Sequence, residues 1–307
     1  MRLIAKLASN LLVLLGSAGI LLAQSTPNIV IILADDLGYA SLNAYGAPTS
    51  MIRTPNMNQL ADEGMRFTDA NTPCSVCTPT RYALLTGRYA WRGRLKYGVL
   101  NQSDGGMLIE KDLLTLPAYL QQKGYTTAHI GKWHLGYTDQ DDFTNYASAP
   151  LEPGPRAIGF DYHFGIPNNL GSAAKVYIEN ETIWGLRSTM VSPYGKSYYS
   201  GEPYHGYNAP QRVTKNVASD LNKRAREWIF KTVREKPDNP FFLYFAPAAI
   251  HNPVSPSEEF RGTSGCGAYG DFIQDLDNSV GEILRASFCF LRTGLKTRIR
   301  SLVLLNV

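Results

Sequence analysis

N-I-V-I-I-L, at residues 28–33, is the run that decides the fold of this 307-residue chain. Its apolar side chains lack the alternation of a half-exposed strand. The run therefore predicts a central strand of a parallel sheet that is covered on both faces. The acidic pair Asp35-Asp36 follows directly. Open α/β sheets bind their ligands at the carboxyl ends of such strands, so this pair marks a candidate site.

Helix signals alternate with further apolar runs along the chain. Proline fits the first helical position and glycine fits the position after the last one. Helices are therefore expected from Thr54-Pro55 to Gly64, from Thr78-Pro79 to Gly87, from Pro117 to Gly124, over Val213–Val233 and over Gly267–Leu284. Strands are expected at Met65–Asp69, Thr126–Gly131, Phe160–Gly165, Val176–Ile178 and Phe241–Phe245. Residues 138–212 are expected to form long surface segments with short strands. Alternating strands and helices predict an α/β fold with a mostly parallel sheet flanked by helices.

The first 23 residues differ from the rest of the chain. Arg2 and Lys6 precede an apolar run, which is the pattern of a secretory signal peptide. A membrane anchor is the alternative, but Gly16 and Gly19 interrupt the run and it is short for a membrane span. We therefore expect export to the periplasm or the cell exterior, and no stable membrane span.

Charge is distributed unevenly along the chain. The net charge is +4, yet residues 1–23 carry two basic residues, residues 285–307 carry five, and neither segment has an acid. Removing these seven positive charges leaves −3 for residues 24–284. The body of the protein is mildly acidic, which argues against nucleic acid as a partner.

Cys77-Thr78-Pro79-Thr80-Arg81 is the segment that is richest in chemistry. A cysteine at the start of a helix lies beside unpaired amides, which favour a thiolate and also favour an anionic substrate. Arg81 adds a fixed positive charge one turn into the helix. Cys74 and Cys77 could instead form a redox pair or half of a zinc site. The sequence has no second Cys-x-x-Cys pair to complete a zinc site.

Cys-x-Pro-x-Arg, followed by Thr86-Gly87-Arg88, resembles the signature of the sulfatases. In that family the cysteine is oxidised to formylglycine by a formylglycine-generating enzyme, and the hydrated aldehyde supplies the hydroxyl that attacks sulfur. The resemblance implies an alkaline phosphatase/sulfatase-like fold and a formylglycine made from Cys77.

The acidic pair Asp35-Asp36 matches the metal-binding pair of the same family. Adjacent carboxylates repel each other, and a hard divalent cation relieves this repulsion. The residues alone permit calcium or magnesium, or merely a helix cap or turn. The resemblance implies Ca²⁺ held by Asp35, Asp36 and the modified Cys77.

Two more segments match the family in order. Gly131-Lys132-Trp133-His134-Leu135-Gly136 implies that Lys132 binds sulfate and that His134 holds the second hydroxyl of the nucleophile. His251-Asn252-Pro253 implies a histidine that contacts sulfate or the leaving oxygen. Taken alone, each histidine could equally be structural. Residues 159–167 are similar to a segment that leads to a polar residue beside the substrate, and Asn169 lies near that position.

The resemblance extends from residue 28 to about residue 284. Residues 24–284 thus correspond to part of a sulfatase catalytic domain, and residues 285–307 form a divergent basic tail. The family continues with a strand and an Asp-Asn-Gly ligand set, neither of which we find in the tail. Asp277-Asn278 lies inside an amphipathic helix pattern, so we reject it as a substitute. We expect an internal strand to be lost, leaving unpaired edges and little turnover.

The function implied is hydrolysis of an organic sulfate ester, and the expected substrate is a sulfated carbohydrate. Catalysis would rest on Cys77, Arg81, Lys132, His134 and His251. A phosphodiester or phosphonate monoester hydrolase of the same superfamily remains an alternative, as does an inactive truncated fragment.

Overall fold

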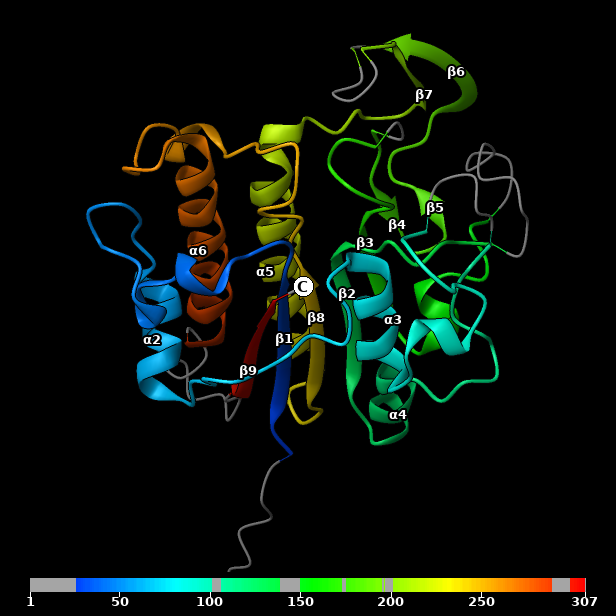
Figure 1. Cartoon of the computed structure of the whole chain (residues 1–307). Coiled ribbons are helices and arrows are strands. Elements are labelled where there is room, and N and C mark those ends of the chain that lie inside the picture. Colours follow the sequence, from blue (N-terminus) through cyan, green and yellow to red (C-terminus); the bar gives the residue numbers. More distant parts are fainter. Residues whose placement is uncertain are drawn as a thin grey trace, which may run out of the picture.

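A computed structural model of the chain describes residues 26–100, 106–138, 150–172, 175–194, 196, 201–288 and 299–306. Its main sheet has seven strands in the order β5-β4-β3-β2-β8-β1-β9 (Figure 1). These strands are β1 (Asn28–Ala34), β2 (Thr126–Lys132), β3 (Tyr162–Ile166), β4 (Ile178–Glu179), β5 (Thr182–Ile183), β8 (Phe241–Ala246) and β9 (Ile299–Asn306). Five neighbouring strands, β3, β2, β8, β1 and β9, run parallel to one another. Strands β4 and β5 add an antiparallel edge beside β3. The predicted fold class is confirmed.

Helices cover both faces of this sheet. They are α2 (Pro55–Glu63), α3 (Cys77–Thr86), α4 (Leu116–Gln122), α5 (Val217–Glu235) and α6 (Gly267–Phe288). Short 3₁₀ turns occupy Tyr39–Ser41, Asn43–Tyr45, Ala90–Arg92, Pro155–Ile158, Thr214–Asn216 and Glu258–Phe260. A separate antiparallel pair, β6 (Ser188–Tyr194) and β7 (Tyr204–Asn208), lies away from the main sheet in Figure 1.

β1 shows how the apolar run produces two layers of core. Val30 and Ile32 pack into the cluster that contains the inner faces of α5 and α6. Ile31 and Leu33 point the other way and pack with residues of α3 and α4. Because successive strand side chains alternate between faces, only a continuously apolar strand can fill both cores.

The predicted helices form near their predicted limits, but one predicted strand is wrong. Residues 64–76 contain neither helix nor strand, so Met65–Asp69 is not a strand. Met65 and Phe67 are largely exposed, and no neighbouring strand pairs with them. Alternating apolar residues alone were insufficient here because a strand also needs a pairing partner. The fourth predicted strand, Val176–Ile178, forms as β4 and is shifted towards Glu179.

The tail also departs from expectation. We predicted that the strand after α6 would be lost, yet residues 299–306 form β9 and pair in parallel with β1. The run Leu302–Leu305 is apolar, so it suits a buried strand despite the basic residues that precede it. The register places Asn306 opposite Ala34, one residue before Asp35. β1 therefore has a hydrogen-bonded neighbour on each side.

Asp277 supports a helix and does not complete a metal site. Its carboxylate on α6 accepts hydrogen bonds from the backbone amides of Asn56 (3.2 Å) and Met57 (2.8 Å) at the start of α2. The Asn56 side chain donates a further bond of 2.7 Å. The rejection of Asp277-Asn278 as a metal ligand pair agrees with this role, since the carboxylate caps a neighbouring helix.

Across the described residues, none of the helices combines the length and apolar character that a bilayer span requires. The predicted signal peptide, residues 1–23, lies outside the described residues and remains a prediction.

Candidate active site

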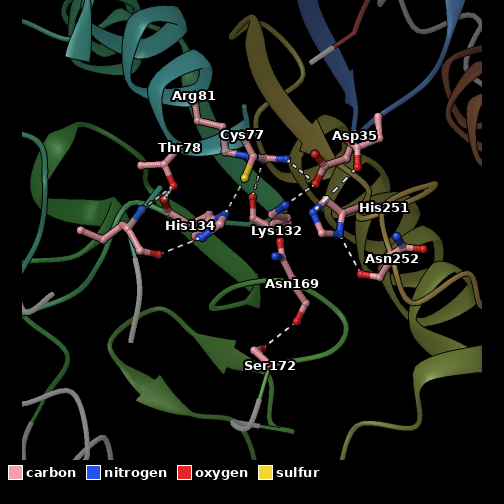
Figure 2. Close-up of polar contacts among 12 residues, drawn as sticks. Asp35, Cys77, Thr78, Arg81, Lys132, His134, Asn169, Ser172, His251 and Asn252 are labelled. Atoms are coloured by element: carbon pink, nitrogen blue, oxygen red, sulfur yellow. Dashed lines mark hydrogen bonds and ion pairs between the residues drawn. The ribbon is translucent and has the colours of Figure 1, made fainter. Parts of the chain in front are cut away.

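The candidate residues from four separate segments meet at one edge of the sheet (Figure 2). Asp35 follows β1, Lys132 ends β2, and His251 follows β8 after a short loop. Cys77 is the first residue of α3. Because β1, β8 and β2 are parallel neighbours, their carboxyl ends share this edge.

A buried carboxylate organises the centre of the site. Asp35 Oδ2 accepts a short hydrogen bond from the Lys132 ammonium and a 3.2 Å bond from Arg81 Nη2, and all three side chains are fully buried. Burial would raise the pKa of Asp35, but the charges of Lys132 and Arg81 hold the pKa below its usual value. Asp35 is therefore ionised at neutral pH, and it holds both cations in place.

Arg81 is a fixed cation at the base of the site. Its Nη1 donates to the Lys132 carbonyl at 2.7 Å and to the Tyr244 hydroxyl at 3.4 Å. Burial alone would lower the pKa of the guanidinium, but Tyr244 and Asp35 raise it. Arg81 consequently stays charged, and it links the end of β2 to α3 and β8.

Cys77 and His134 form the contact with the clearest chemical direction. Cys77 Sγ lies 3.1 Å from His134 Nδ1, and His134 Nε2 lies 3.0 Å from the carbonyl oxygen of Leu100. A carbonyl can only accept, so Nε2 carries the proton. Burial, then the charges of Lys132 and Arg81, hold the pKa of His134 well below 6.5. The ring is therefore neutral, and Nδ1 is a bare acceptor aimed at residue 77.

The start of α3 adds positive potential to the same space. Val76, the residue before the helix, makes no side-chain cap to the first amides. The helix therefore begins with the amides of Cys77 and Thr78 next to the Arg81 and Lys132 cations, since Pro79 has no amide hydrogen and the Thr80 amide donates to the Val76 carbonyl. A helix start of this kind stabilises negative charge. Together these groups suit a compact anion that is bound beside Cys77.

The second carboxylate, Asp36, has different surroundings from Asp35. Its side chain is 56% exposed, and its backbone adopts a left-handed φ of 65°. Asp36 Oδ2 lies 3.8 Å from His251 Nε2, and His251 Nδ1 donates to the carbonyl of Asn252 at 2.7 Å. Backbone bonds between Asp35 and residues 249–250 hold the two segments together. The pair thus divides into one buried and one solvent-facing carboxylate.

The fit of the acidic pair to a cation rests on one atom. Asp35 Oδ1 is buried, and no hydrogen-bond partner for it exists among the described residues. An ionised buried oxygen without a donor needs a positive partner. Within the described part of the chain, no three His, Cys, Asp or Glu side chains are already clustered as a metal site. The predicted ligand set Asp35, Asp36 and Cys77 therefore stays a proposal.

Sequence reasoning named Asn169 through the similarity of residues 159–167 to a family segment, but it missed Tyr244. Asn169 points towards Lys132 in Figure 2, and its buried Oδ1 has no partner among the described residues. Tyr244 contacts Arg81 and would have been assigned to the core strand alone. No periodicity or motif distinguishes Tyr244, because the sheet register brings it to the site.

A buried hydrogen-bonded chain below the site was also missed. His163 Nδ1 lies 2.8 Å from His129 Nδ1, and His163 Nε2 lies 2.9 Å from the Tyr137 hydroxyl. His129 and Tyr137 flank the turn that carries Lys132 and His134. His163 therefore joins the two ends of the segment that supplies both site residues. Burial lowers the pKa of His163 to about 3, so the His163 ring that makes these two hydrogen bonds is uncharged at neutral pH.

The fold and the site define an α/β protein whose parallel sheet edge brings two buried cations and a cysteine together. The sulfatase family profile matches residues 27–286, and the chain belongs to this family. The match ends close to residue 284, where the resemblance in the sequence also ends.

Several known proteins are similar to this chain. It is 31% identical to an N-acetylgalactosamine-6-O-sulfatase of Bacteroides thetaiotaomicron, over 84% of this chain and 55% of that protein. It is 34% identical to arylsulfatase A of Homo sapiens, over 91% of this chain and 52% of that protein. A solved B. thetaiotaomicron structure, described with the metabolism of multiple glycosaminoglycans, superposes with a TM-score of 0.75 at 29% identity, covering 89% and 61% of the two chains. The chain spans about half the length of the curated relatives it matches.

Proposed function

We propose that this chain carries the sulfate-ester-hydrolysing site of a formylglycine-dependent sulfatase. One observation carries the proposal: Cys77 Sγ lies 3.1 Å from the bare Nδ1 of a neutral His134, at a helix start lined by two buried cations. Membership of the sulfatase family supports it. The chemistry that follows assigns a role to each side chain.

Cys77 and His134 would handle the nucleophile. A formylglycine made from Cys77 would supply, as its hydrate, a hydroxyl placed to attack sulfur. His134 Nδ1 faces that side chain and is free to accept a hydroxyl proton, while the Leu100 carbonyl fixes the tautomer of the ring. A formylglycine-generating enzyme would be the partner needed for maturation.

Lys132, Arg81 and His251 would bind and neutralise the sulfate. The ammonium of Lys132 and the guanidinium of Arg81 are held by Asp35, so neither needs to reorganise as charge develops. His251 lies at the more open side of the site, where it can meet the leaving oxygen. Asn169 adds a polar group opposite Lys132.

A divalent cation, which we propose is Ca²⁺, would bind at Asp35 Oδ1 with Asp36 and residue 77 as further ligands. Carboxylate oxygens are the ligands that this hard cation prefers, and the partnerless Oδ1 supports the choice. The cation would supply Lewis-acid stabilisation of negative charge on the nucleophile. A calcium-dependent rise in melting temperature that disappears in Asp36→Asn would support this ligand set.

The substrate we propose is a sulfated carbohydrate. The similar B. thetaiotaomicron protein is named an N-acetylgalactosamine-6-O-sulfatase, and the similar solved structure is described with the metabolism of glycosaminoglycans. A substrate of this size outside the cell would agree with the predicted signal peptide. We therefore propose an exported enzyme.

Turnover of three small esters tests the reaction. Purified chain, coexpressed with a formylglycine-generating enzyme, should hydrolyse 4-nitrophenyl sulfate faster than an aryl phosphodiester or phosphonate monoester. Cys77→Ala should abolish this activity, whereas Cys74→Ala should retain it, because the described contacts of Cys74 are made by its backbone carbonyl. Preference for a phosphorus ester would favour the other hydrolase class, and no turnover of any ester would favour an inactive fragment.

A further inference from the structure

The loop after α3 combines exposed aromatic rings with basic side chains. Tyr89 and Trp91 stack with ring centroids 5.7 Å apart and an interplanar angle of 14°. Trp91 is 58% exposed, and Tyr97 is 90% exposed. Single exposed rings are common, but exposed apolar groups that lie together mark binding surfaces.

Charge on this loop has one sign. Arg88, Arg92, Arg94 and Lys96 lie within ten residues, and the sequence contains no Asp or Glu from residue 70 to residue 103. The Arg92 guanidinium lies 6.0 Å from the Trp91 ring. None of the ion pairs formed within the described residues involves Arg92 or Lys96. The loop therefore offers cations and flat apolar rings side by side.

The loop leads directly into the candidate active site. Leu100 accepts from His134 through its carbonyl, and its amide donates to Thr78 Oγ1 at 3.2 Å. Three peptide units separate Tyr97 from Leu100, so their Cα atoms lie within about 11 Å of each other. Lys96 Nζ donates to the Trp91 carbonyl at 3.1 Å, so residues 91–97 form one continuous piece of loop whose last residue lies within about 11 Å of Leu100.

We infer that Trp91, Arg92, Lys96 and Tyr97 form a binding strip for the chain of a sulfated oligosaccharide whose reacting sulfate occupies the site at Cys77. This inference rests on the proposed function and deepens it, because it selects a polymeric substrate. The apolar faces of pyranose rings stack on Trp and Tyr, and guanidinium and ammonium groups pair with sulfate esters of neighbouring sugars. Single-stranded nucleic acid also uses rings and cations, but the strip continues into a site of the sulfatase family and so favours sulfated sugar.

Binding without turnover tests the strip. The Cys77→Ala full-length chain would be titrated by calorimetry with a sulfated hexasaccharide that contains N-acetylgalactosamine, with its desulfated form, and with an oligonucleotide of equal charge. We expect Trp91→Ala and Arg92→Gln each to weaken hexasaccharide binding about tenfold. We expect the desulfated form to bind more weakly by at least a similar factor, and higher salt to weaken binding.

The matched control is Tyr119→Ala. Tyr119 is an exposed ring on α4 with the Lys123 ammonium 5.3 Å from its centroid, and so it has the same chemistry at another place. Its loss should leave the affinity unchanged. Parent-like affinity in both strip variants, an effect of equal size in the control, or tighter binding of the oligonucleotide would each overturn the inference. If the strip variants weaken binding but the parent chain with intact Cys77 hydrolyses none of the three esters, the proposed function is overturned and the binding strip is not.

Discussion

Replacing Asp35 by asparagine removes the charge that holds the site together. The substitution keeps the shape of the side chain, but it leaves Lys132 and Arg81 buried without a counter-ion. Removing one member of a buried ion pair costs about 3–5 kcal/mol, because the remaining charge is uncompensated. Here two cations share the one carboxylate, so we expect a loss at the upper end of that range.

The assay is urea unfolding in calcium-free buffer, followed by circular dichroism, with Asp36→Asn as the control. Asp36 is its chain neighbour and has the same chemistry, but its side chain is 56% exposed. Its replacement should change the free energy of unfolding by no more than about 0.5 kcal/mol. Adding Lys132→Met to Asp35→Asn should recover part of the loss, because one orphaned charge is removed. Equal effects of the two asparagine variants, or a loss below about 1 kcal/mol for Asp35→Asn, would refute the reasoning.

The same pair predicts an acid limit to stability. The pKa of Asp35 is lower in the folded chain than the value of about 3.9 in the unfolded chain. A depressed carboxyl pKa contributes stability that is complete above the unfolded pKa and is lost as pH falls through the folded pKa. The difference in unfolding free energy between parent and Asp35→Asn should therefore shrink on acidification below about pH 4.

Three other changes give independent tests. Gly131 has a φ of +133°, and Gly131→Ala would place a methyl group 2.1 Å from the Ala246 carbonyl oxygen, so this variant should not fold stably. In the control Gly46→Ala the new methyl group meets no atom within 4 Å, and thermal melts should show a cost of only about 1 kcal/mol. His163→Phe should cost about 2–3 kcal/mol in urea unfolding, because it removes two buried hydrogen bonds, one to His129 Nδ1 and one to the Tyr137 hydroxyl. The pKa of His163 is about 3 in the folded chain and about 6.5 in the unfolded chain, so protonation of the unfolded chain lowers the stability of the parent as pH falls below about 6.5. The free energy of unfolding of the variant should therefore depend less on pH between about 7.5 and 5. Asp277→Ala should cost about 1–2 kcal/mol by removing the cap of α2. Its neighbour Asn278 is half-buried and accepts only a 3.3 Å bond from Arg285, so Asn278→Ala should cost under about 0.5 kcal/mol, and equal losses would contradict the capping role.

The sequence was sufficient for those parts of the fold that local chemistry determines. The two-faced apolar run of β1 and the Pro-to-Gly limits of α2, α3 and α4 depend on residues close together in the chain. They were predictable for that reason. The strand expected at Met65–Asp69 failed because strand formation depends on a partner, which alternation does not reveal.

β9 shows the reverse error. Because the tail departs from the family, an internal strand was expected to be lost and edges to stay unpaired, yet residues 299–306 form a strand that pairs with β1. Among the site residues, Cys77, Arg81, Lys132 and His134 were accessible because motifs mark them. Tyr244 was not accessible, because only the lateral order of β1, β8 and β2 brings it beneath the site.

The mass of the tryptic peptide that ends at Arg81 tests the central claim most directly. The account predicts that chain coexpressed with a formylglycine-generating enzyme carries an aldehyde at position 77, with Cys74 in the same peptide still a thiol. An unmodified thiol at position 77 under these conditions would contradict it, because the neutral His134 beside it would then face no hydroxyl.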